Sequence, residues 1–268
     1  MANTAQENWG AGDPYELYVG RWSRKVAVEF LEWISIPAKS AWVDIGCGTG
    51  ALTQCILAQS DPQSIAGIDK AEGFIGTARR TIIDPRATLE AGDAAKLPWE
   101  SHSFDAAVSA LVLNFVQDPH KMLSEMARVT RSGGKVAAYV WDYAGGMEMM
   151  RYFWDAAIAV SPNDSKLDQA ERFPICQPEP LEALFTDTGL KAVSSRSLEI
   201  PTVFRNFDDY WKPFLGKQGA APTYLASVTE ETREKIRARL EACLLPSADG
   251  TIRLHARAWA VQGTVASA

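Results

Sequence analysis

Between residues 42 and 142 the chain alternates between short runs rich in β-branched residues and segments with an apolar side chain every three or four positions. This alternation is typical of a parallel sheet with helices on both faces. The runs that we expect to form strands are AWVDIG, SIAGID, ATLEAGD, FDAAVSALVL and KVAAYVW. The pattern therefore predicts an α/β fold with a mostly parallel sheet.

Helical periodicity places two helices beside these strands. Residues 23–34 carry one apolar stripe, which predicts a leading helix. Asp118 can cap a second helix with Pro119 at its first position, and residues 132–134 are expected to end it, because SGG is typical of a helix terminus. The apolar face of this second helix is formed by Met122, Leu123, Met126 and Val129.

After residue 142 the regular alternation ends. Helical segments are predicted near Met147, over 180–188 and over 229–244, and two late runs, 190–203 and 251–264, look extended. About fifty residues separate the two extended runs. We expect the intervening segment to be a helical cap inserted before the last strand.

Composition limits the kind of partner. The 268 residues are 47% hydrophobic, which is enough for a large core, and the formal charge of -6 argues against binding nucleic acid or anionic lipid. The first residues show no signal-peptide pattern and no apolar run reaches a membrane span, so we expect a cytoplasmic protein. The four cysteines and three histidines show no metal-ligand spacing, and we predict no metal site.

Candidate chemistry centres on VDIGCGTG, residues 43–50, where a predicted strand meets a predicted helix. Gly46, Gly48 and Gly50 allow a tight turn and the close approach of a ligand to the backbone. Doubly wound folds bind their ligands at such strand ends. The carboxylate of Asp44 would repel a pyrophosphate but would suit a ligand that carries an ammonium group, which favours an amino-acid-bearing nucleotide over a dinucleotide.

VDIGCGTG resembles the first motif of the class I S-adenosylmethionine-dependent methyltransferases, whose loop holds the methionine part of the cofactor. Asp69 lies 69 − 50 = 19 residues beyond Gly50, where a ribose-binding acid belongs. GDAAKLPWESHSFD resembles the family's third motif, in which Asp93 would accept from the adenine amino group and the backbone of Ala94 would read the ring edge. MARVTRSGGKVAAYVW resembles the family's helix, turn and fifth strand.

This resemblance covers about residues 42–141 and implies a Rossmann-like fold with a seven-stranded sheet. It also implies S-adenosyl-L-methionine as cofactor and S-adenosyl-L-homocysteine as product. In similar small-molecule methyltransferases a tyrosine or arginine of the leading segment lies over the cofactor, and the end of the fourth strand borders the methionine portion. The expected cofactor-binding residues are Tyr18, Arg21, Asp44, Gly46, Cys47, Gly48, Gly50, Asp69, Lys70, Asp93, Ala94, Ser109, Ala110 and Leu111.

The resemblance suggests a division of the chain into three parts. Residues 1–40 would be an N-terminal helical segment over the cofactor site, residues 41–205 with 251–268 the core, and residues 206–250 the cap that shapes an acceptor pocket. Two groups of largely aromatic residues are candidates for lining that pocket, and the alternative is that they only pack cap against core. They are Trp141, Tyr143, Met147, Phe153 and Trp154, and Phe207, Tyr210, Trp211 and Phe214.

The leading hypothesis is methyl transfer to a small hydrophobic or aromatic molecule, with oxygen, nitrogen and carbon acceptors all open. Ubiquinone/menaquinone methyltransferases are the nearest general likeness. Such an enzyme needs no nucleophilic residue, and Asp142 and Tyr143 are the candidates if a base is required. The sequence around Asn114 and Phe115 lacks the N-P-P-Y motif of DNA amino-group methylases. A non-catalytic S-adenosylmethionine sensor or partner module and an NAD(P)-dependent oxidoreductase remain alternatives, and a monomer and a homodimer are both open.

Overall fold

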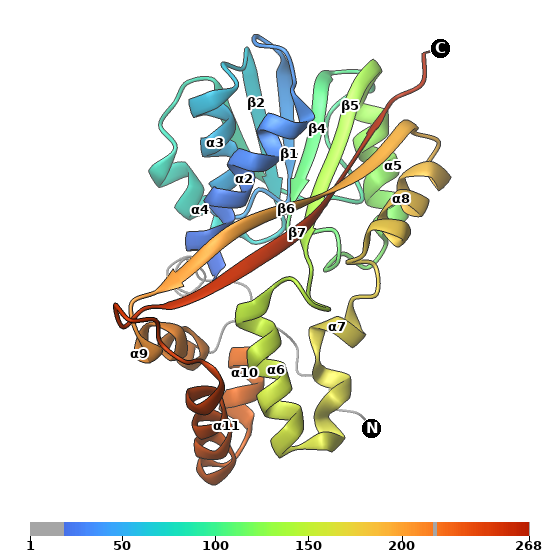
Figure 1. The fold of residues 1–268 in the computed structure, drawn as a ribbon. Helices are drawn as coiled ribbons and strands as arrows, with labels where there is room; N and C mark the ends of the chain where they lie inside the picture. The colour runs from blue at the N-terminus through green and yellow to red at the C-terminus, as the bar shows by residue number, and fades with distance from the viewer. Residues whose placement is uncertain (1–18, 217–218, 268) are drawn as a thin grey trace. The chain divides into compact units, whose positions relative to one another are not determined.

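The structure is a computed structural model in which residues 19–216 and 219–267 are described (Figure 1). Its sheet has seven strands in the order β3-β2-β1-β4-β5-β7-β6. β1 pairs in parallel with β2 and β4, β2 with β3, and β4 with β5. The strands are β1 (Ala41–Ile45), β2 (Ser64–Asp69), β3 (Ala87–Ala91), β4 (Phe104–Ala110), β5 (Thr130–Trp141), β6 (Lys191–Phe204) and β7 (Ile252–Thr264). The predicted α/β fold and its mostly parallel sheet are confirmed.

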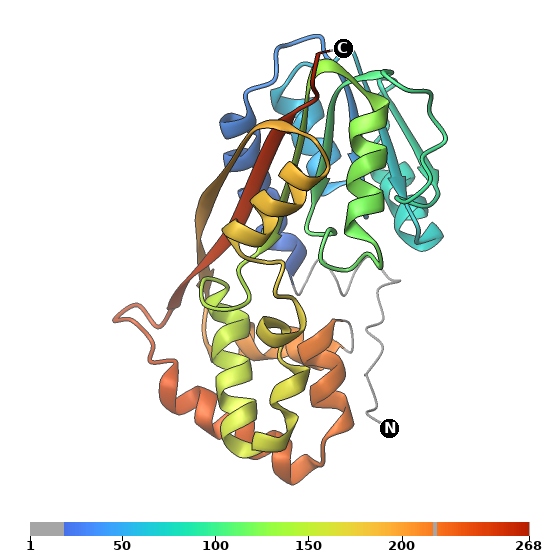
Figure 2. The same ribbon diagram turned by 90° about the vertical axis from the view of Figure 1, so that its right-hand side faces the viewer.

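Helices connect these strands, and those predicted over residues 23–34, near Met147, over 180–188 and over 229–244 are present. The α-helices are α2 (Arg21–Ile34), α3 (Ala51–Gln59), α4 (Glu72–Thr81), α5 (Pro119–Val129), α6 (Glu148–Val160), α7 (Gln169–Arg172), α8 (Pro178–Asp187), α9 (Phe207–Trp211), α10 (Ala220–Ser227) and α11 (Glu230–Cys243). Two 3-10 helices, η2 (Pro162–Leu167) and η3 (Lys212–Gly216), complete the connections. The cap predicted for α5 is confirmed, since the Lys121 backbone N–H donates to Asp118 Oδ1 over 2.8 Å. Figure 2 shows α2 and α5 on opposite faces of the sheet.

The predicted end of α5 is wrong. The helix ends at Val129, and residues 130–134 already belong to β5. The glycines serve the sheet: a Cβ on Gly134 would lie 2.7 Å from the Asp105 carbonyl oxygen, and the Gly133 N–H donates to the Val265 carbonyl over 2.9 Å. Glycine at this position therefore permits close approach of neighbouring strands instead of ending a helix.

β5 and β7 run in opposite directions. Gly133, near the start of β5, bonds to Val265, just beyond the end of β7. Asp142, directly after β5, donates its N–H to Arg257, which lies nearer the start of β7. The late extended runs predicted from the sequence thus form strands β6 and β7, with a helical insertion between them.

The chain divides into two compact units. Among the described residues, the sheet unit contains Ser23–Val140, Ile175–Leu198 and residues 259–267. The helical unit contains residues 19–22, Trp141–Pro174 and the described part of Glu199–Ala258. This division differs from the expected one, which placed residues 141–174 in the core with the early strands. The difference arises because α6 packs against α10 and α11, so residues distant in sequence form one helical unit.

The centre of the sheet unit is filled by buried, mostly apolar side chains. Trp42, Val43 and Ile45 of β1 are all buried, as expected for a central strand with helices on both faces. The ring of Phe30 from α2 lies 4.8 Å from that of Tyr139 on β5. This packing holds the carboxyl ends of the central strands in fixed positions.

Candidate functional site

The glycine loop, residues 46–50, connects β1 to α3. Gly46, Gly48 and Gly50 have φ values of 74°, 54° and 89°, in the left-handed region that favours glycine. A Cβ on Gly46 would lie 2.6 Å from Val112 Cγ2, whereas no described atom lies within 4 Å of a Cβ placed on Gly48. Packing therefore requires glycine at position 46, and open space adjoins position 48.

Most N–H groups of the glycine loop are already bonded within the protein. Those of Gly46 and Cys47 donate to the Ile68 carbonyl over 2.7 and 3.0 Å. The N–H of Gly50 donates to the Cys47 carbonyl over 2.8 Å, and that of Gly48 donates to Asp69 Oδ2 over 2.9 Å. These four N–H groups do not form a cradle for phosphate oxygens, which argues against a dinucleotide ligand.

Asp44 is a fully buried carboxylate on β1, directly before the glycine loop. Thr53 Oγ1 donates to its Oδ2 over 2.7 Å, and no group in the described part of the chain hydrogen-bonds to its Oδ1. Burial raises the pKa of Asp44 to about 7; the Thr53 hydrogen bond opposes this shift, and the charge of Asp69 adds to it. A buried carboxylate with one unpaired oxygen suits a cationic donor such as an ammonium group.

Asp69 ends β2 and holds the glycine loop from the other side. Its Oδ1 accepts the Ala71 N–H over 2.8 Å while its Oδ2 accepts the Gly48 N–H. Burial raises the pKa of Asp69, and the hydrogen bonds from Ala71 and Gly48 oppose that shift. Because each carboxylate oxygen can accept a second hydrogen bond, the fixed carboxylate can also receive two hydroxyl groups.

The strand order brings several predicted residues to one edge of the sheet. β1 and β4 are neighbours although β2 and β3 intervene in the chain, so the topological switch point lies between β1 and β4. Asp44 and the glycine loop lie at this switch point on the β1 side, and residues 109–111 lie on the β4 side. Asp69 follows on β2 and Asp93 just beyond β3, so these predicted residues lie at the carboxyl ends of four adjacent strands.

Residues 109–111 have structural tasks of their own. Ser109 is buried, and its hydroxyl donates to the Ile45 carbonyl over 2.8 Å, which fastens β4 to β1. Ala110 is the last residue of β4. Leu111 has a φ of 61° and donates its N–H to the Tyr139 carbonyl over 2.8 Å. A left-handed leucine at the end of a strand is strained backbone of the kind found at ligand sites.

Other predicted residues differ in what their side chains can offer. Asp93 is exposed, with Oδ1 accepting the Ala95 N–H over 2.9 Å, and Ala94 lies between the two. Lys70 is exposed directly after Asp69. The Cys47 thiol is instead buried against Ile75, Ala78 and Leu89, so only its backbone borders the open side of the glycine loop.

Of the two N-terminal candidates, Arg21 belongs to the helical unit, and Tyr18 lies outside the described residues. The guanidinium of Arg21 lies 3.4 Å from Asp209 Oδ1 and stacks on the rings of Trp22 and Phe204, at 4.5 and 4.8 Å from their centroids. Its contact with a cofactor carboxylate stays a prediction.

Asp142 and Tyr143, the candidate bases, take part in the structure of the turn after β5. Asp142 is buried and accepts the N–H groups of Gly145 and Gly146 over 3.2 and 3.0 Å. It also lies 3.6 Å from Arg257 Nη1. The Tyr143 ring is buried 5.6 Å from that of Phe173. These contacts give both side chains a structural role and leave a catalytic role without support.

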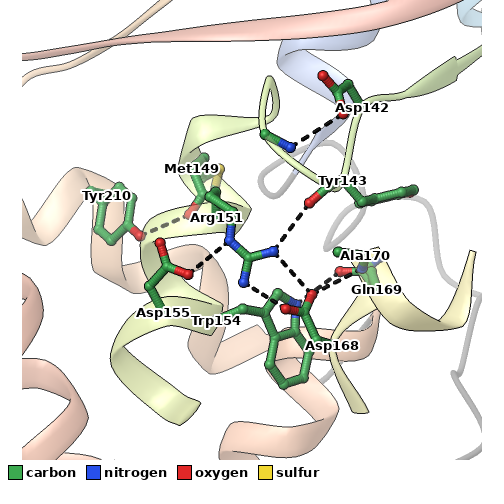
Figure 3. Close-up of polar contacts among 11 residues, drawn as sticks. Asp142, Tyr143, Met149, Arg151, Trp154, Asp155, Asp168, Gln169, Ala170 and Tyr210 are labelled. Atoms are coloured by element: carbon green, nitrogen blue, oxygen red, sulfur yellow. Dashed lines mark hydrogen bonds and ion pairs between the residues drawn. The ribbon is translucent and has the colours of Figure 1, made fainter. Parts of the chain in front are cut away.

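A polar network centred on Arg151 organises the helical unit (Figure 3). Arg151 Nη2 lies 2.6 Å from Asp168 Oδ2, and Nε donates to Asp155 Oδ1 over 2.9 Å. Nη1 donates to the Tyr143 carbonyl and to Asp168 Oδ1, in both cases over 3.3 Å. Asp168 also caps α7 through the Ala170 N–H. The network ties α6 to the turn before it and to α7 after it.

The aromatic residues of the helical unit pack on one another. The Phe153 and Phe214 rings stack 4.6 Å apart, and the Trp154 ring lies 5.4 Å from that of Tyr224. The Tyr210 hydroxyl donates to the Met149 carbonyl over 2.8 Å. The four rings just named and Tyr210 are almost completely buried, so they form the interior of this unit and give no evidence of an acceptor pocket.

Sequence reasoning missed two residues of the site. Thr53 holds Asp44, and Val112 packs against Gly46. The periodicity of α3 placed Thr53 on a helix but could not show that it faces β1, and Val112 looked like one more apolar residue at the end of a strand.

Within the described residues no cluster of three or more His, Cys, Asp or Glu side chains could hold a metal ion. No described helix is long and apolar enough to cross a membrane.

Comparison with known sequences supports the family resemblance. Residues 43–138 match the sequence model of the family described as "Methyltransferase domain". The chain is 31% identical over 137 residues to 2-methyl-6-phytyl-1,4-hydroquinone methyltransferase 2, chloroplastic, from Oryza sativa subsp. japonica, covering 51% of this chain and 39% of that protein. It is 27% identical over 151 residues to the demethylmenaquinone methyltransferase of Lactobacillus johnsonii, covering 54% of this chain and 60% of the relative. The matches thus span less than two thirds of either relative.

Solved structures share the fold at low sequence identity. The YcgJ protein from Bacillus subtilis superposes with a TM-score of 0.59 at 17% identity, covering 91% of this chain and 99% of that one. Phosphoethanolamine N-methyltransferase 2 from Haemonchus contortus, solved in complex with S-adenosyl-L-methionine, gives a TM-score of 0.58 at 16% identity, covering 91% of this chain and 53% of that one. The predicted Rossmann-like fold is therefore confirmed.

Proposed function

We propose that the chain transfers a methyl group from S-adenosyl-L-methionine to a small hydrophobic or aromatic molecule, since residues 43–138 match the sequence model of the family described as "Methyltransferase domain". The observation that carries the proposal is the buried carboxylate of Asp44, which has an unpaired Oδ1 among the described residues. It lies beside a glycine loop whose N–H groups at positions 46, 47, 48 and 50 are bonded internally. Such a site suits an ammonium-bearing nucleotide and disfavours one that needs a phosphate cradle.

The sheet unit offers a group for each part of this cofactor. Asp44 would accept a hydrogen bond from the ammonium group, and Asp69 would accept from the ribose hydroxyls. Asp93 and the backbone of Ala94 would read the adenine edge. The open space at Gly48 leaves room for the methionine portion beside the backbone. The remaining predicted contacts are those of Tyr18, Arg21, Gly46, Cys47, Gly50, Lys70, Ser109, Ala110 and Leu111.

The protein's own contribution to such a reaction is placement. When bound, the sulfonium of S-adenosyl-L-methionine supplies an activated methyl group. The side chains around it then have to align the acceptor and exclude water, and alignment alone can be worth roughly 7–11 kcal/mol. Since Asp142 already accepts two backbone N–H groups, the proposal assigns no general base.

The acceptor class is supported by the relatives. The names of the two curated relatives refer to a phytyl hydroquinone and to demethylmenaquinone, both of which combine an aromatic or quinonoid ring with a long apolar chain. The aromatic residues of the helical unit do not add support, because their rings are buried against one another. A hydroquinone with a short apolar chain is therefore the first acceptor to test.

The test has two steps. Calorimetry with S-adenosyl-L-homocysteine and with NAD(P) should show binding of the first alone, and selective binding of NAD(P) would overturn the proposal. Incubation with methyl-labelled S-adenosyl-L-methionine and the hydroquinone should then give labelled product. Cofactor binding without labelled product, from this acceptor and from metabolite extracts, would favour a non-catalytic sensor instead.

A further inference from the structure

Asn114 is a buried polar side chain that the cofactor site does not use. It is only 9% exposed, and among the described residues neither its Oδ1 nor its Nδ2 has a hydrogen-bond partner. A carboxamide carries two N–H donors and an oxygen that can accept two hydrogen bonds. Because burying such a group without partners destabilises a fold, an unpaired carboxamide calls for an explanation.

The position of Asn114 in the fold suggests one. It lies four residues beyond Ala110, the end of β4, on the β4 side of the topological switch point. Val112, two residues earlier, packs against Gly46 of the glycine loop, so that a Cβ there would lie 2.6 Å from Val112 Cγ2. Asn114 therefore follows directly on the segment that rests against the proposed cofactor loop.

The backbone fixes this segment. Leu111 is held in the left-handed region with a φ of 61°, and the Phe115 N–H donates to the Val112 carbonyl over 2.8 Å, which closes a turn over residues 112–115. Leu113 is 1% exposed and anchors the turn in the core. Strained backbone that the surroundings hold in place is characteristic of ligand-binding segments.

We propose that the carboxamide of Asn114 binds the polar group of the methyl acceptor, and that this group is a neutral hydroxyl. The inference rests on the proposed function. A hydroxyl can donate to Oδ1 and accept from Nδ2, which matches what the carboxamide offers. The carboxamide carries no charge, so it offers neither an anionic nor a cationic group an ion-pair partner.

This contact orients the acceptor and takes no proton from it. A carboxamide is not basic, so Asn114 would fix the direction of the hydroxyl, and with it the ring, by hydrogen bonds alone. The contact is shielded from bulk water because both polar atoms of Asn114 are buried. Hydrogen bonds in such surroundings are stronger than in water, which favours a hydroxyl-bearing acceptor over its hydrocarbon analogue.

The test compares 1-naphthol with naphthalene as probes of the protein saturated with S-adenosyl-L-homocysteine. Calorimetry should show that the wild-type complex prefers 1-naphthol by about 10- to 100-fold, the range for a hydrogen bond to a buried polar group. Asn114→Leu, which has nearly the same size, should lose this preference and keep its affinity for S-adenosyl-L-homocysteine. Asn163→Leu, at an exposed position of η2, is the matched control and should behave as wild type.

Each other outcome overturns a defined claim. Equal affinities for the two probes in the wild-type complex, or an unchanged preference in Asn114→Leu, would overturn the inference alone. A loss of S-adenosyl-L-homocysteine affinity in Asn114→Leu beyond about tenfold would assign the residue to the cofactor and so overturn the inference too. If the wild-type chain binds no S-adenosyl-L-homocysteine, the proposed function fails and the inference fails with it. Thermal unfolding checks the fold of each variant, and Asn114→Ala replaces Asn114→Leu if the latter does not fold.

Discussion

Each of the two units buries a carboxylate, and the two carboxylates differ in how completely they are hydrogen-bonded. In the helical unit Asp168 is 4% exposed and is bonded by the Arg151 guanidinium and the Ala170 N–H. In the sheet unit Asp44 is 0% exposed and is bonded by Thr53, with no partner for Oδ1 among the described residues. The first is a completed structural ion pair, and the second still has bonding capacity. A ligand donor can therefore form a new hydrogen bond with Asp44, whereas Asp168 already has its partners.

Removing the cation from the completed pair should have the largest effect. Arg151→Leu leaves Asp168 buried and uncompensated, and we expect a loss of about 3–5 kcal/mol in the free energy of unfolding. The affinity for S-adenosyl-L-homocysteine should not change. Urea unfolding measures the first quantity and calorimetry the second.

The matched control for this prediction is an exposed ion pair of the same chemistry. Arg253 pairs with Asp249, and both side chains are more than half exposed, so Arg253→Leu should cost less than about 1 kcal/mol. Equal losses in the two variants would show that the network around Arg151 contributes no more than a surface pair.

Asp69→Ala should change ligand affinity strongly, whereas Arg151→Leu is expected to change stability and leave affinity unaltered. The change removes the acceptor for the Gly48 and Ala71 N–H groups and the proposed ribose contact. We expect the affinity for S-adenosyl-L-homocysteine to fall by about 100-fold or more, or about 2.7 kcal/mol. The control is Asp187→Ala at the exposed end of α8, whose calorimetric affinity should equal that of wild type. An unchanged affinity in Asp69→Ala would count against the assigned site.

The raised pKa of Asp44, about 7, makes both ligand binding and stability depend on pH. An ammonium ligand needs the ionised carboxylate, so its affinity should fall about tenfold for each pH unit below 7. The stability of the protein without ligand depends on pH in the opposite direction to the ligand affinity. The folded state holds the Asp44 proton more tightly than the unfolded chain, so this stabilisation is complete below a pH of about 4 and is lost as the pH rises through about 7.

Asp44→Asn provides the comparison for these two pH dependences. The variant cannot titrate at this position, so the slope of S-adenosyl-L-homocysteine affinity between pH 5.5 and 8 should flatten to about zero. Calorimetry in buffers with different heats of ionisation should also show that wild type releases a proton on binding below pH 7 and that the variant does not. A wild-type affinity independent of pH would exclude an ionised Asp44 as the ammonium partner.

The smallest expected effect concerns two glycines with the same backbone requirement. Gly48 and Gly133 have φ values of 54° and 75°, and no described atom lies within 4 Å of a Cβ placed on either. Substitution by alanine should therefore cost each variant about 1 kcal/mol of unfolding free energy. Only Gly48→Ala should also lose S-adenosyl-L-homocysteine affinity, since its methyl group would enter the space proposed for the ligand. Equal affinities in the two variants would contradict that placement.

Local sequence signals predicted much of the sheet unit. VDIGCGTG combined a strand pattern with glycines at three positions that indeed have positive φ, and the helix cap at Asp118 follows from side-chain chemistry within a few residues. The prediction that residues 132–134 end α5 was wrong, because glycine occurs both as a helix terminator and where two strands approach each other closely. Only the position of Asp105 relative to Gly134 distinguishes the two uses.

The features that could not be predicted from the sequence depend on packing between residues far apart in the chain. The pairing of Asp44 with Thr53 depends on which face of α3 meets β1, and the grouping of residues 141–174 with the helical insertion depends on contacts of α6 with α11. The same aromatic residues could line a pocket or fill a core, since composition and spacing are alike in both cases. The stacking of Phe153 on Phe214, both fully buried, shows that these two rings fill a core.

The burial of Cys47 has a practical consequence for labelling. Its thiol lies in the proposed binding loop yet is sealed against Ile75, Ala78 and Leu89, and burial raises its pKa well above the usual value, with Asp44 and Asp69 adding to the shift. Cys176 is also buried, whereas Cys243 at the end of α11 is exposed. A maleimide dye should therefore attach first to Cys243, which would give a fluorescent reporter without altering any residue proposed to bind the nucleotide.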